Sequence, residues 1–304
     1  MRSKFVWEPR TVHASDGAPL RLTCTPPTPG LPVLLLGAPG TPPSFWSHQV
    51  AYLQARHQVI AFEHPEVFHD GPRTTSLDRM RKDVLEALQA LEIPRAALVA
   101  WGLGTQLALD LLGQPSSSFT HLAAINPLFT RGFARALGIL GRDVVGPVLG
   151  RLAARATPWL AQAHRRLPFL DAGAWLRRAG LASSTIEPEA LGEAIRDLGG
   201  LRTAGIGRVL RALEGQTQGP IPEGIPQPVL LVVGQNDVVA SGLLARRLAR
   251  RLPLGELLVI RGGTHLTPLE YPEYVSLAVE KFLNGASVAA YSSAQVVDAR
   301  RPRR

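Results

Sequence analysis

The stretch of sequence that decides the fold is residues 98–105, which read LVAWGLGT. It joins an apolar run to a glycine-rich turn, Gly102 to Gly104, and then to leucines that recur at helical spacing. An apolar run without alternation is typical of a strand that is buried on both faces. The stretch therefore predicts a buried strand, a tight glycine turn and a helix, in that order.

Similar apolar runs lie on both sides of this strand. They are residues 33–36, 59–62, 122–125, 229–233 and 257–260. Helical patterns separate most of them, and one begins after Ser76, a residue type that is favoured as a helix N-cap. Strands that alternate with helices predict an α/β fold with a mostly parallel, doubly wound sheet. Residues 11–24 contain an Asp-Gly pair between two short runs and predict an N-terminal antiparallel hairpin.

The alternation stops between Phe129 and Ile225, where helical patterns are frequent and no strand pattern is found. We therefore predict a core of residues 1–128 and 226–285, a helical insertion of residues 129–225, and a disordered basic tail of residues 286–304. An insertion between two strands can cover the carboxyl edge of the sheet, where ligands bind in open α/β folds. We expect a cap over the site; a second small domain without a ligand role is the alternative.

Composition excludes several classes of protein. The chain has 304 residues, of which 45% are hydrophobic and 19% charged, which excludes a disordered chain. Its net charge is +9, but only 6% of residues are aromatic and no basic patch is interleaved with aromatic residues, so we expect no nucleic-acid partner. No apolar run approaches the roughly 18 residues of a membrane span, and no apolar leader opens the chain. A single cysteine, Cys24, excludes an intrachain disulfide, and we expect a cytoplasmic protein.

Polar residues follow the last two strand-like runs. Asp237 comes after residues 229–233, and His265 comes after residues 257–260. The order of strand, glycine turn, helix, acid and histidine resembles the α/β-hydrolase superfamily over residues 11–284. This resemblance implies an α/β-hydrolase fold with an N-terminal antiparallel hairpin and an inserted helical cap. It also implies that Asp237 and His265 are the acid and the base of a catalytic triad.

The chain departs from the family at the nucleophile. The family's strand-to-helix turn reads G-x-S-x-G, and its serine attacks the substrate. Here the first, third and last positions of that motif are Ala100, Gly102 and Gly104. Glycine relieves the backbone strain of such a turn but supplies no attacking oxygen. We expect the missing side chain to leave a space near His265 that a water molecule or a small substrate group fills.

Other nucleophiles remain open at this stage. Thr105 lies one turn into the predicted helix, Thr41 and Ser44 lie near the loop at residues 37–40, and Cys24 belongs to the early hairpin. Each would need hydrogen-bond contact with its base. A dinucleotide site is excluded, because the third glycine of G-x-G-x-x-G is replaced by Leu107.

Two loops after strands bear on the chemistry. Relatives commonly read His-Gly-x-Pro-Gly after the first buried strand, whereas residues 37–40 read GAPG, without the histidine. The resemblance implies that the backbone N–H groups of Ala38 and Leu103 form an oxyanion hole. Residues 63–71, EHPEVFHDG, contain two histidines and three acidic residues, but their spacing fits no standard zinc pattern. We therefore expect no metal and no cofactor, and we leave open a substrate contact from His64 or His69.

Two functions are compatible with these residues. In the first, His265 oriented by Asp237 acts as a general base without covalent catalysis, in the hydrolysis of an ester or thioester or in a lyase, isomerase or cyclase step. In the second, the protein is catalytically inactive and binds a ligand or a partner. We expect a small apolar ligand under the cap, where large apolar residues are frequent, although these residues also suit the cap's own interior. They are Leu137, Leu149, Trp159, Phe169 and Trp175.

Overall fold

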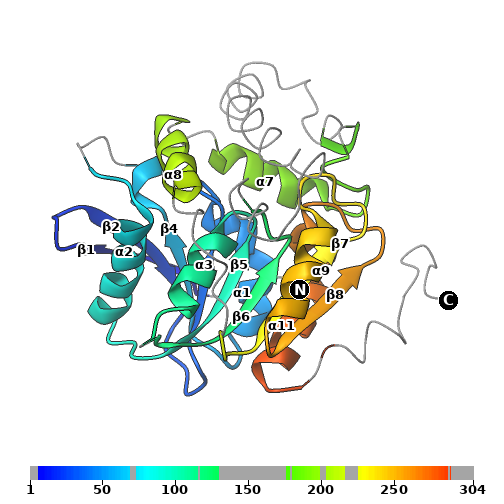
Figure 1. Ribbon diagram of the computed structural model, residues 1–304. Helices are drawn as coiled ribbons and strands as arrows, with labels where there is room; N and C mark the ends of the chain where they lie inside the picture. The colour runs from blue at the N-terminus through cyan, green and yellow to red at the C-terminus, as the bar shows by residue number, and fades with distance from the viewer. Residues whose placement is uncertain are drawn as a thin grey trace.

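The computed structural model describes residues 6–68, 73–115, 117–129, 176–178, 180–198, 203–215, 225–286 and 288. Within these residues lies one eight-stranded sheet with the strand order β1-β2-β4-β3-β5-β6-β7-β8 (Figure 1). The strands are β1 (Glu8–His13), β2 (Pro19–Cys24), β3 (Val33–Leu36), β4 (Val59–Glu63), β5 (Ala96–Trp101), β6 (Phe119–Ile125), β7 (Val229–Gly234) and β8 (Gly255–Ile260). The pairs β1–β2 and β2–β4 are antiparallel, and all other neighbours are parallel. The predicted mostly parallel sheet with an N-terminal antiparallel hairpin is confirmed.

Helices cover both faces of the sheet (Figure 1). Their bounds are α1 (Ser47–Leu53), α2 (Leu77–Ala90), α3 (Gly104–Leu112), α7 (Pro188–Leu198), α8 (Thr203–Gly215), α9 (Gly242–Arg251), α10 (Thr267–Glu270) and α11 (Pro272–Leu283), with short 3-10 helices η1 (Pro43–Trp46) and η2 (Pro65–Val67). Buried residues of α2, α3 and α9 share one core cluster, and those of α1 and α11 share another. The Ser76 hydroxyl accepts the amide of Arg79 at 3.1 Å, as expected for the N-cap of α2.

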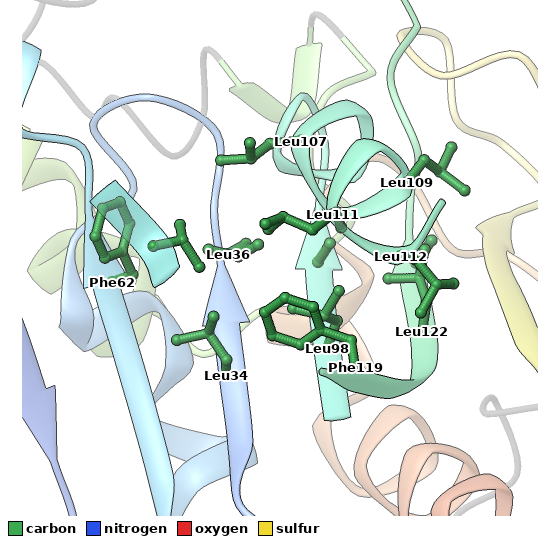
Figure 2. Packing of buried hydrophobic residues seen from close by; sticks show 14 of the residues in the cluster. Leu34, Leu36, Phe62, Leu98, Leu107, Leu109, Leu111, Leu112, Phe119 and Leu122 are labelled. Atoms are coloured by element: carbon green, nitrogen blue, oxygen red, sulfur yellow. The ribbon is translucent and has the colours of Figure 1, made fainter. Parts of the chain in front are cut away.

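The two core clusters explain the unbroken apolar runs. In β3, Leu34 and Leu36 enter the first cluster, whereas Val33 and Leu35 enter the second. All four are at most 1% exposed. Figure 2 shows part of the first cluster, in which leucines of β3, β5 and α3 pack together. Each strand of this kind has two buried faces, so every position favours an apolar residue.

The strand order reverses direction between β3 and β5. From β3 the chain moves to β4 on one side, and from β4 it crosses to β5 on the other side of β3. The loops that follow β3 and β5 therefore leave the sheet in opposite directions. Ligands bind at such a switch point in open α/β sheets. Residues 37–40 follow β3, and Gly102 follows β5, so both lie where the topology favours a site.

The region between β6 and β7 is described in part. Within its described residues there is no strand; α7 packs against η1 and α8 packs against η2, after the carboxyl ends of β3 and β4. The contact of α8 is backbone to backbone, because a Cβ at Gly205 would lie 1.9 Å from the Glu66 carbonyl oxygen. Residues 130–175 of the predicted helical insertion, which include the five apolar residues expected under the cap, lie outside the described residues, as does the tail beyond residue 288.

We find no helix among the described residues with the length and apolar character that a membrane crossing requires.

Candidate active site

The turn between β5 and α3 has the backbone conformation that glycine favours. Gly102 has φ 58°, in the left-handed region. Its amide donates to the Ile125 carbonyl oxygen at 3.1 Å, and its own carbonyl accepts from the Leu128 amide at 3.0 Å. These two bonds fix the turn against the end of β6, so residue 102 is held at the carboxyl edge of the sheet.

The space beside Gly102 faces His265. A Cβ built on Gly102 would lie 3.7 Å from the Ala38 Cβ, 3.9 Å from the His265 Nε2 and 4.0 Å from the Leu128 Cδ1. These are ordinary van der Waals distances, so a short side chain would fit without a clash. The turn, the loop after β3 and the loop of residues 261–266, here called the histidine loop, therefore meet at one point.

His265 and Asp237 form a hydrogen-bonded pair. The His265 Nδ1 lies 2.9 Å from the Asp237 Oδ2, and the two side chains are 10% and 1% exposed. The other carboxylate oxygen of Asp237 accepts the amides of Val239 and Ala240, each at 2.8 Å. With its Nδ1 proton donated to Asp237, a neutral His265 ring presents the lone pair of Nε2 towards Gly102.

The environment of Asp237 favours the charged carboxylate. Burial opposes its ionisation, but the hydrogen bond from His265, the histidine's charge and the two backbone donors outweigh that cost. The net result is that the pKa of Asp237 is lowered from its ordinary value of 3.8. A charged Asp237 can hold the imidazole in one tautomer and stabilise the imidazolium that forms when the ring takes a proton.

Asn126 completes the surroundings of Asp237. It follows β6, is fully buried and has φ 44°, which asparagine tolerates better than most residues. Its Nδ2 donates to the Asp237 Oδ2 at 2.8 Å and to the Thr264 carbonyl oxygen at 3.0 Å. Its Oδ1 accepts from the Thr267 hydroxyl. Sequence reasoning missed Asn126, although its place directly after a buried strand run at the same sheet edge is a signal that could have found it.

Trp101 lies beside the histidine ring. The centroids of the two rings are 5.2 Å apart, and the indole Nε1 donates to the His265 carbonyl oxygen at 3.1 Å. Because Trp101 is the last residue of β5, this contact ties the histidine loop to the strand that leads into Gly102.

The loop after β3 supplies the second side of the site. The Thr41 amide donates to the Ala38 carbonyl oxygen at 2.8 Å, which closes the turn of this loop. Among the described residues we find no acceptor for the backbone N–H of Ala38 or of Leu103. The Ala38 Cβ lies next to the space beside Gly102. Both amides are therefore available as donors, which is what an oxyanion hole requires.

Three of the four candidate substitute nucleophiles, Thr105, Thr41 and Cys24, are not hydrogen-bonded to the histidine ring in the described part of the chain. Within the described part of the chain, the only hydrogen bond of the His265 ring is the one to Asp237. The hydroxyl oxygens of Thr105 and Thr41 are buried, and no hydrogen bond of either to the ring is found in the described residues. Cys24 lies on β2, which is separated from β3 by β4, and burial raises the pKa of its thiol to about 11. A thiol with so high a pKa is a weak nucleophile near neutral pH.

The polar loop after β4 is partly buried structure. His64 is 3% exposed, and its Nε2 lies 3.3 Å from the Gly37 carbonyl oxygen. Burial lowers the pKa of His64, although nearby acidic groups oppose this, so the ring stays neutral and can donate to that carbonyl. Within the described residues no group of three metal-ligating side chains is found. His69 and Asp70 lie outside the described residues.

Comparison with known proteins extends these observations. A model of the alpha/beta hydrolase family matches residues 33–277. The chain is 33% identical over 116 residues to a putative carbamate hydrolase RutD of Klebsiella pneumoniae (strain 342), covering 36% of this chain and 44% of that protein. It is 25% identical over 261 residues to a putative carbamate hydrolase RutD of Caulobacter sp. (strain K31), covering 82% of this chain and 88% of that protein. The stronger identity thus spans less than half of the relative's length.

Solved structures share the architecture. An enol-lactonase from Burkholderia xenovorans LB400 superposes with a TM-score of 0.68 at 20% identity, covering 90% of this chain and 100% of that chain. A carboxylesterase, CesB, from Bacillus subtilis superposes with a TM-score of 0.68 at 16% identity, covering 93% of this chain and 94% of that chain. At these identities the likeness shows the fold.

Proposed function

The chain belongs to the alpha/beta hydrolase family, and from this premise we propose that it hydrolyses a small acyl compound by direct attack of water. The single observation that supports this most is the placement of the His265 Nε2, 3.9 Å from where a Cβ of residue 102 would lie. That ring is oriented by Asp237 through its Nδ1. A water molecule in the space beside Gly102 would therefore lie within reach of a prepared general base.

The proposed reaction has two steps. His265 Nε2 takes a proton from the water as the water oxygen forms a bond to the acyl carbon, and Asp237 stabilises the resulting imidazolium. The carbonyl oxygen becomes an oxyanion, which the N–H groups of Ala38 and Leu103 stabilise. When the tetrahedral intermediate collapses, the bond to the leaving group breaks and His265 returns the proton to that group. No bond to the protein forms at any stage.

The substrate class follows from the chemistry and from the named relatives. The proteins compared above are named as a putative carbamate hydrolase, an enol-lactonase and a carboxylesterase. Carbamates, lactones and carboxylic esters all contain an acyl carbon bonded to a heteroatom. We infer an acyl compound of this kind, with an apolar body under the predicted cap. The same base could instead take a proton from a substrate carbon, as in a lyase, isomerase or cyclase step, because water and such a carbon would occupy the same space.

Binding without catalysis is the second candidate function. The specific observation that favours it is that residue 102 has no side chain, and removal of a triad serine normally eliminates most of the rate. The base pair would then serve to hold a polar ligand group. A ligand that binds at this site and is recovered unchanged would support this function.

The test of direct water attack combines a probe with an isotope. A serine-directed fluorophosphonate should leave the wild-type protein unlabelled, whereas Gly102→Ser should be labelled, since the introduced hydroxyl would lie beside the His265 Nε2. In H₂¹⁸O, a single turnover of an activated ester should place ¹⁸O in the product acid, which excludes attack by a protein carboxylate; attack by a hydroxyl or a thiol is tested by the search for an acyl adduct. Intact-protein mass spectrometry of the quenched reaction should detect no acyl adduct on the wild type.

The control is Gly102→Ala, which adds the Cβ without the hydroxyl and should remain unlabelled. Stable labelling of the wild type, or an acyl adduct on it, would show that another residue acts as nucleophile and would overturn the proposal. Absence of turnover with esters, lactones and carbamates that do bind would instead favour the binding function.

A further inference from the structure

A buried carboxylate lies directly behind the histidine loop. Glu270, the last residue of α10, is 5% exposed. Its Oε2 accepts the Thr264 amide at 2.6 Å, and its Oε1 lies 2.6 Å from the Thr264 hydroxyl oxygen. The same Oε1 accepts the Ser183 amide at 2.6 Å. An ionised carboxylate only accepts hydrogen bonds, so Glu270 matches three converging donors.

Two of these donors belong to Thr264, the residue before His265. The Thr264 carbonyl accepts from Asn126, as described above, so Thr264 is held by Asn126 on its carbonyl and by Glu270 on its amide and hydroxyl. Thr264 is itself 6% exposed. Thr264 is therefore held on both sides: Asn126 holds the carbonyl of the peptide unit that joins it to His265, and Glu270 holds the N–H of the preceding unit.

The third donor comes from a distant part of the chain. Ser183 lies between β6 and β7, 87 residues before Glu270. The neighbouring Leu181 carbonyl lies 2.9 Å from the Thr264 hydroxyl oxygen. Ala182 and Ile186 are 4% and 3% exposed and belong to the same core cluster as Leu269. Residues 181–186 are thus packed beside the loop that carries His265 and are hydrogen-bonded to Glu270 through the Ser183 amide.

From these contacts we propose that Glu270 is a positioning residue that makes the placement of the His265 ring depend on the seating of residues 181–186. This role rests on the proposed function, in which His265 is the base. When the segment is seated, the Ser183 amide holds the carboxylate in the orientation that also binds Thr264. When the segment moves away, Oε1 loses that donor, and the hold on the histidine loop weakens. The position of residues 181–186 would in this way determine how firmly the His265 ring is held.

The first variant is Glu270→Gln, which keeps the size of the side chain. An amide has one acceptor oxygen, so its NH₂ group must face either the Thr264 amide or the Ser183 amide, and a donor would then face a donor. The Thr264 hydroxyl can turn to accept from the NH₂, which favours the arrangement that releases Ser183. We expect the Ser183 amide to exchange its hydrogen about tenfold faster. Glu273→Gln, the same change at an exposed position three residues along, is the matched control.

The second variant separates coupling from local bracing. Ser183→Pro removes the amide donor together with the hydroxyl and fixes φ, whereas Ser183→Ala removes the hydroxyl and keeps the amide donor, so the comparison of the two variants separates the amide from the hydroxyl. The readout is the titration midpoint and Nδ1–H signal of the His265 ring, followed by NMR without substrate and assigned with His265→Ala. We expect Ser183→Pro and Glu270→Gln to shift these signals and Ser183→Ala and Glu273→Gln to leave them unchanged. The double variant Ser183→Pro/Glu270→Gln should match Glu270→Gln alone.

Each outcome decides the proposal. If Glu270→Gln shifts the ring signals and Ser183→Pro does not, Glu270 braces the loop locally and the coupling is refuted. If neither shifts them, the positioning role is refuted as well. If Ser183→Pro does not fold, the Ser183 amide exchange and ring signals of Glu270→Gln decide instead. Because no substrate enters the measurement, these results are independent of whether the protein turns over an acyl compound.

Discussion

The two halves of the candidate site are built by different means. The half at the ends of β7 and β8 is a network of side chains, in which the Asp237 carboxylate alone accepts four hydrogen bonds. The half at the ends of β3 and β5 has almost no functional side chain and is held by close backbone contacts. A Cβ at Gly104 would lie 2.2 Å from the Leu36 carbonyl oxygen, so the start of α3 rests directly against the end of β3.

This difference indicates where the chemistry resides. Buried polar groups destabilise a fold unless each finds a partner, so a network in which Asp237 and Asn126 are both hydrogen-bonded beside a buried histidine is costly to build for packing alone. The backbone half needs no particular side chain to present its amides. In the proposed function, proton transfer belongs to the first half and charge stabilisation to the second, with a space between them at Gly102.

The largest expected effect concerns the base. His265→Ala should lower kcat by about a thousandfold, because general base catalysis contributes on that scale, while ligand binding is retained. Steady-state kinetics with the acyl substrate and calorimetric binding would measure the two quantities separately. An unchanged kcat would show that the side chains at the ends of β7 and β8 do not carry out the proton transfer.

The next effect concerns the backbone half. Gly104→Ala should lower the free energy of unfolding by about 3 kcal/mol, since its Cβ has no room against the Leu36 carbonyl. Gly102→Ala is the matched control; it adds strain at a positive φ but meets nothing within 3.7 Å, and we expect a loss of about 1 kcal/mol. Urea denaturation would measure both. Equal losses would show that close backbone contact does not distinguish the two glycines.

A smaller effect concerns the network. Asn126→Gly keeps a backbone that tolerates φ 44° but removes the donor to Asp237, and we expect a loss of about 2 kcal/mol of unfolding free energy. Asn284→Gly, at the exposed C-cap of α11, should cost well under about 1 kcal/mol. If both substitutions have the same small effect, the hydrogen bonds of Asn126 do not stabilise the network.

The smallest expected effect is on the pH dependence of stability. The folded-state pKa of Asp237 lies below 3.8, so its charge stabilises the folded state above that pH, and this contribution is lost as the pH falls through the folded-state value. The unfolding free energy of Asp237→Asn should therefore decrease less between about pH 5 and pH 2 than that of the wild type. Denaturation curves measured over this range would test it; identical pH profiles would contradict it.

Much of the fold could be predicted from the sequence. The six apolar runs correspond to β3 to β8. Both faces of the runs in β3 to β7 are buried, whereas Leu257 and Val259 of the edge strand β8 are only half-buried. The positions of Asp237 and His265 after strand-like runs placed them at one sheet edge. The hairpin at residues 11–24 followed from its Asp-Gly pair, and Gly17 has φ 81° there. Strands and helices that are buried in a regular way have a regular hydrophobic pattern, and this pattern can be recognised in the sequence.

The supporting residues of the site could not be found in the same way. Asn126, Glu270 and Ser183 make contacts across 138, 6 and 87 residues, and none belongs to a periodic pattern. In the sequence, a single buried polar residue cannot be distinguished from a surface residue, because its hydrogen-bond partners come close only in the folded chain. The role of the segment between β6 and β7 depends on its contacts with Glu270 and Thr264. The sequence pattern therefore predicted only that the segment is helical.

The chain's single cysteine has a practical consequence. Cys24 is 4% exposed within β2, and burial leaves it a protonated thiol near neutral pH. A maleimide dye should therefore react with a cysteine introduced on an exposed loop far faster than with Cys24. Fluorophore pairs could then be attached to residues 181–186 and to the sheet without first replacing the native thiol, and energy transfer between them would report how the segment moves.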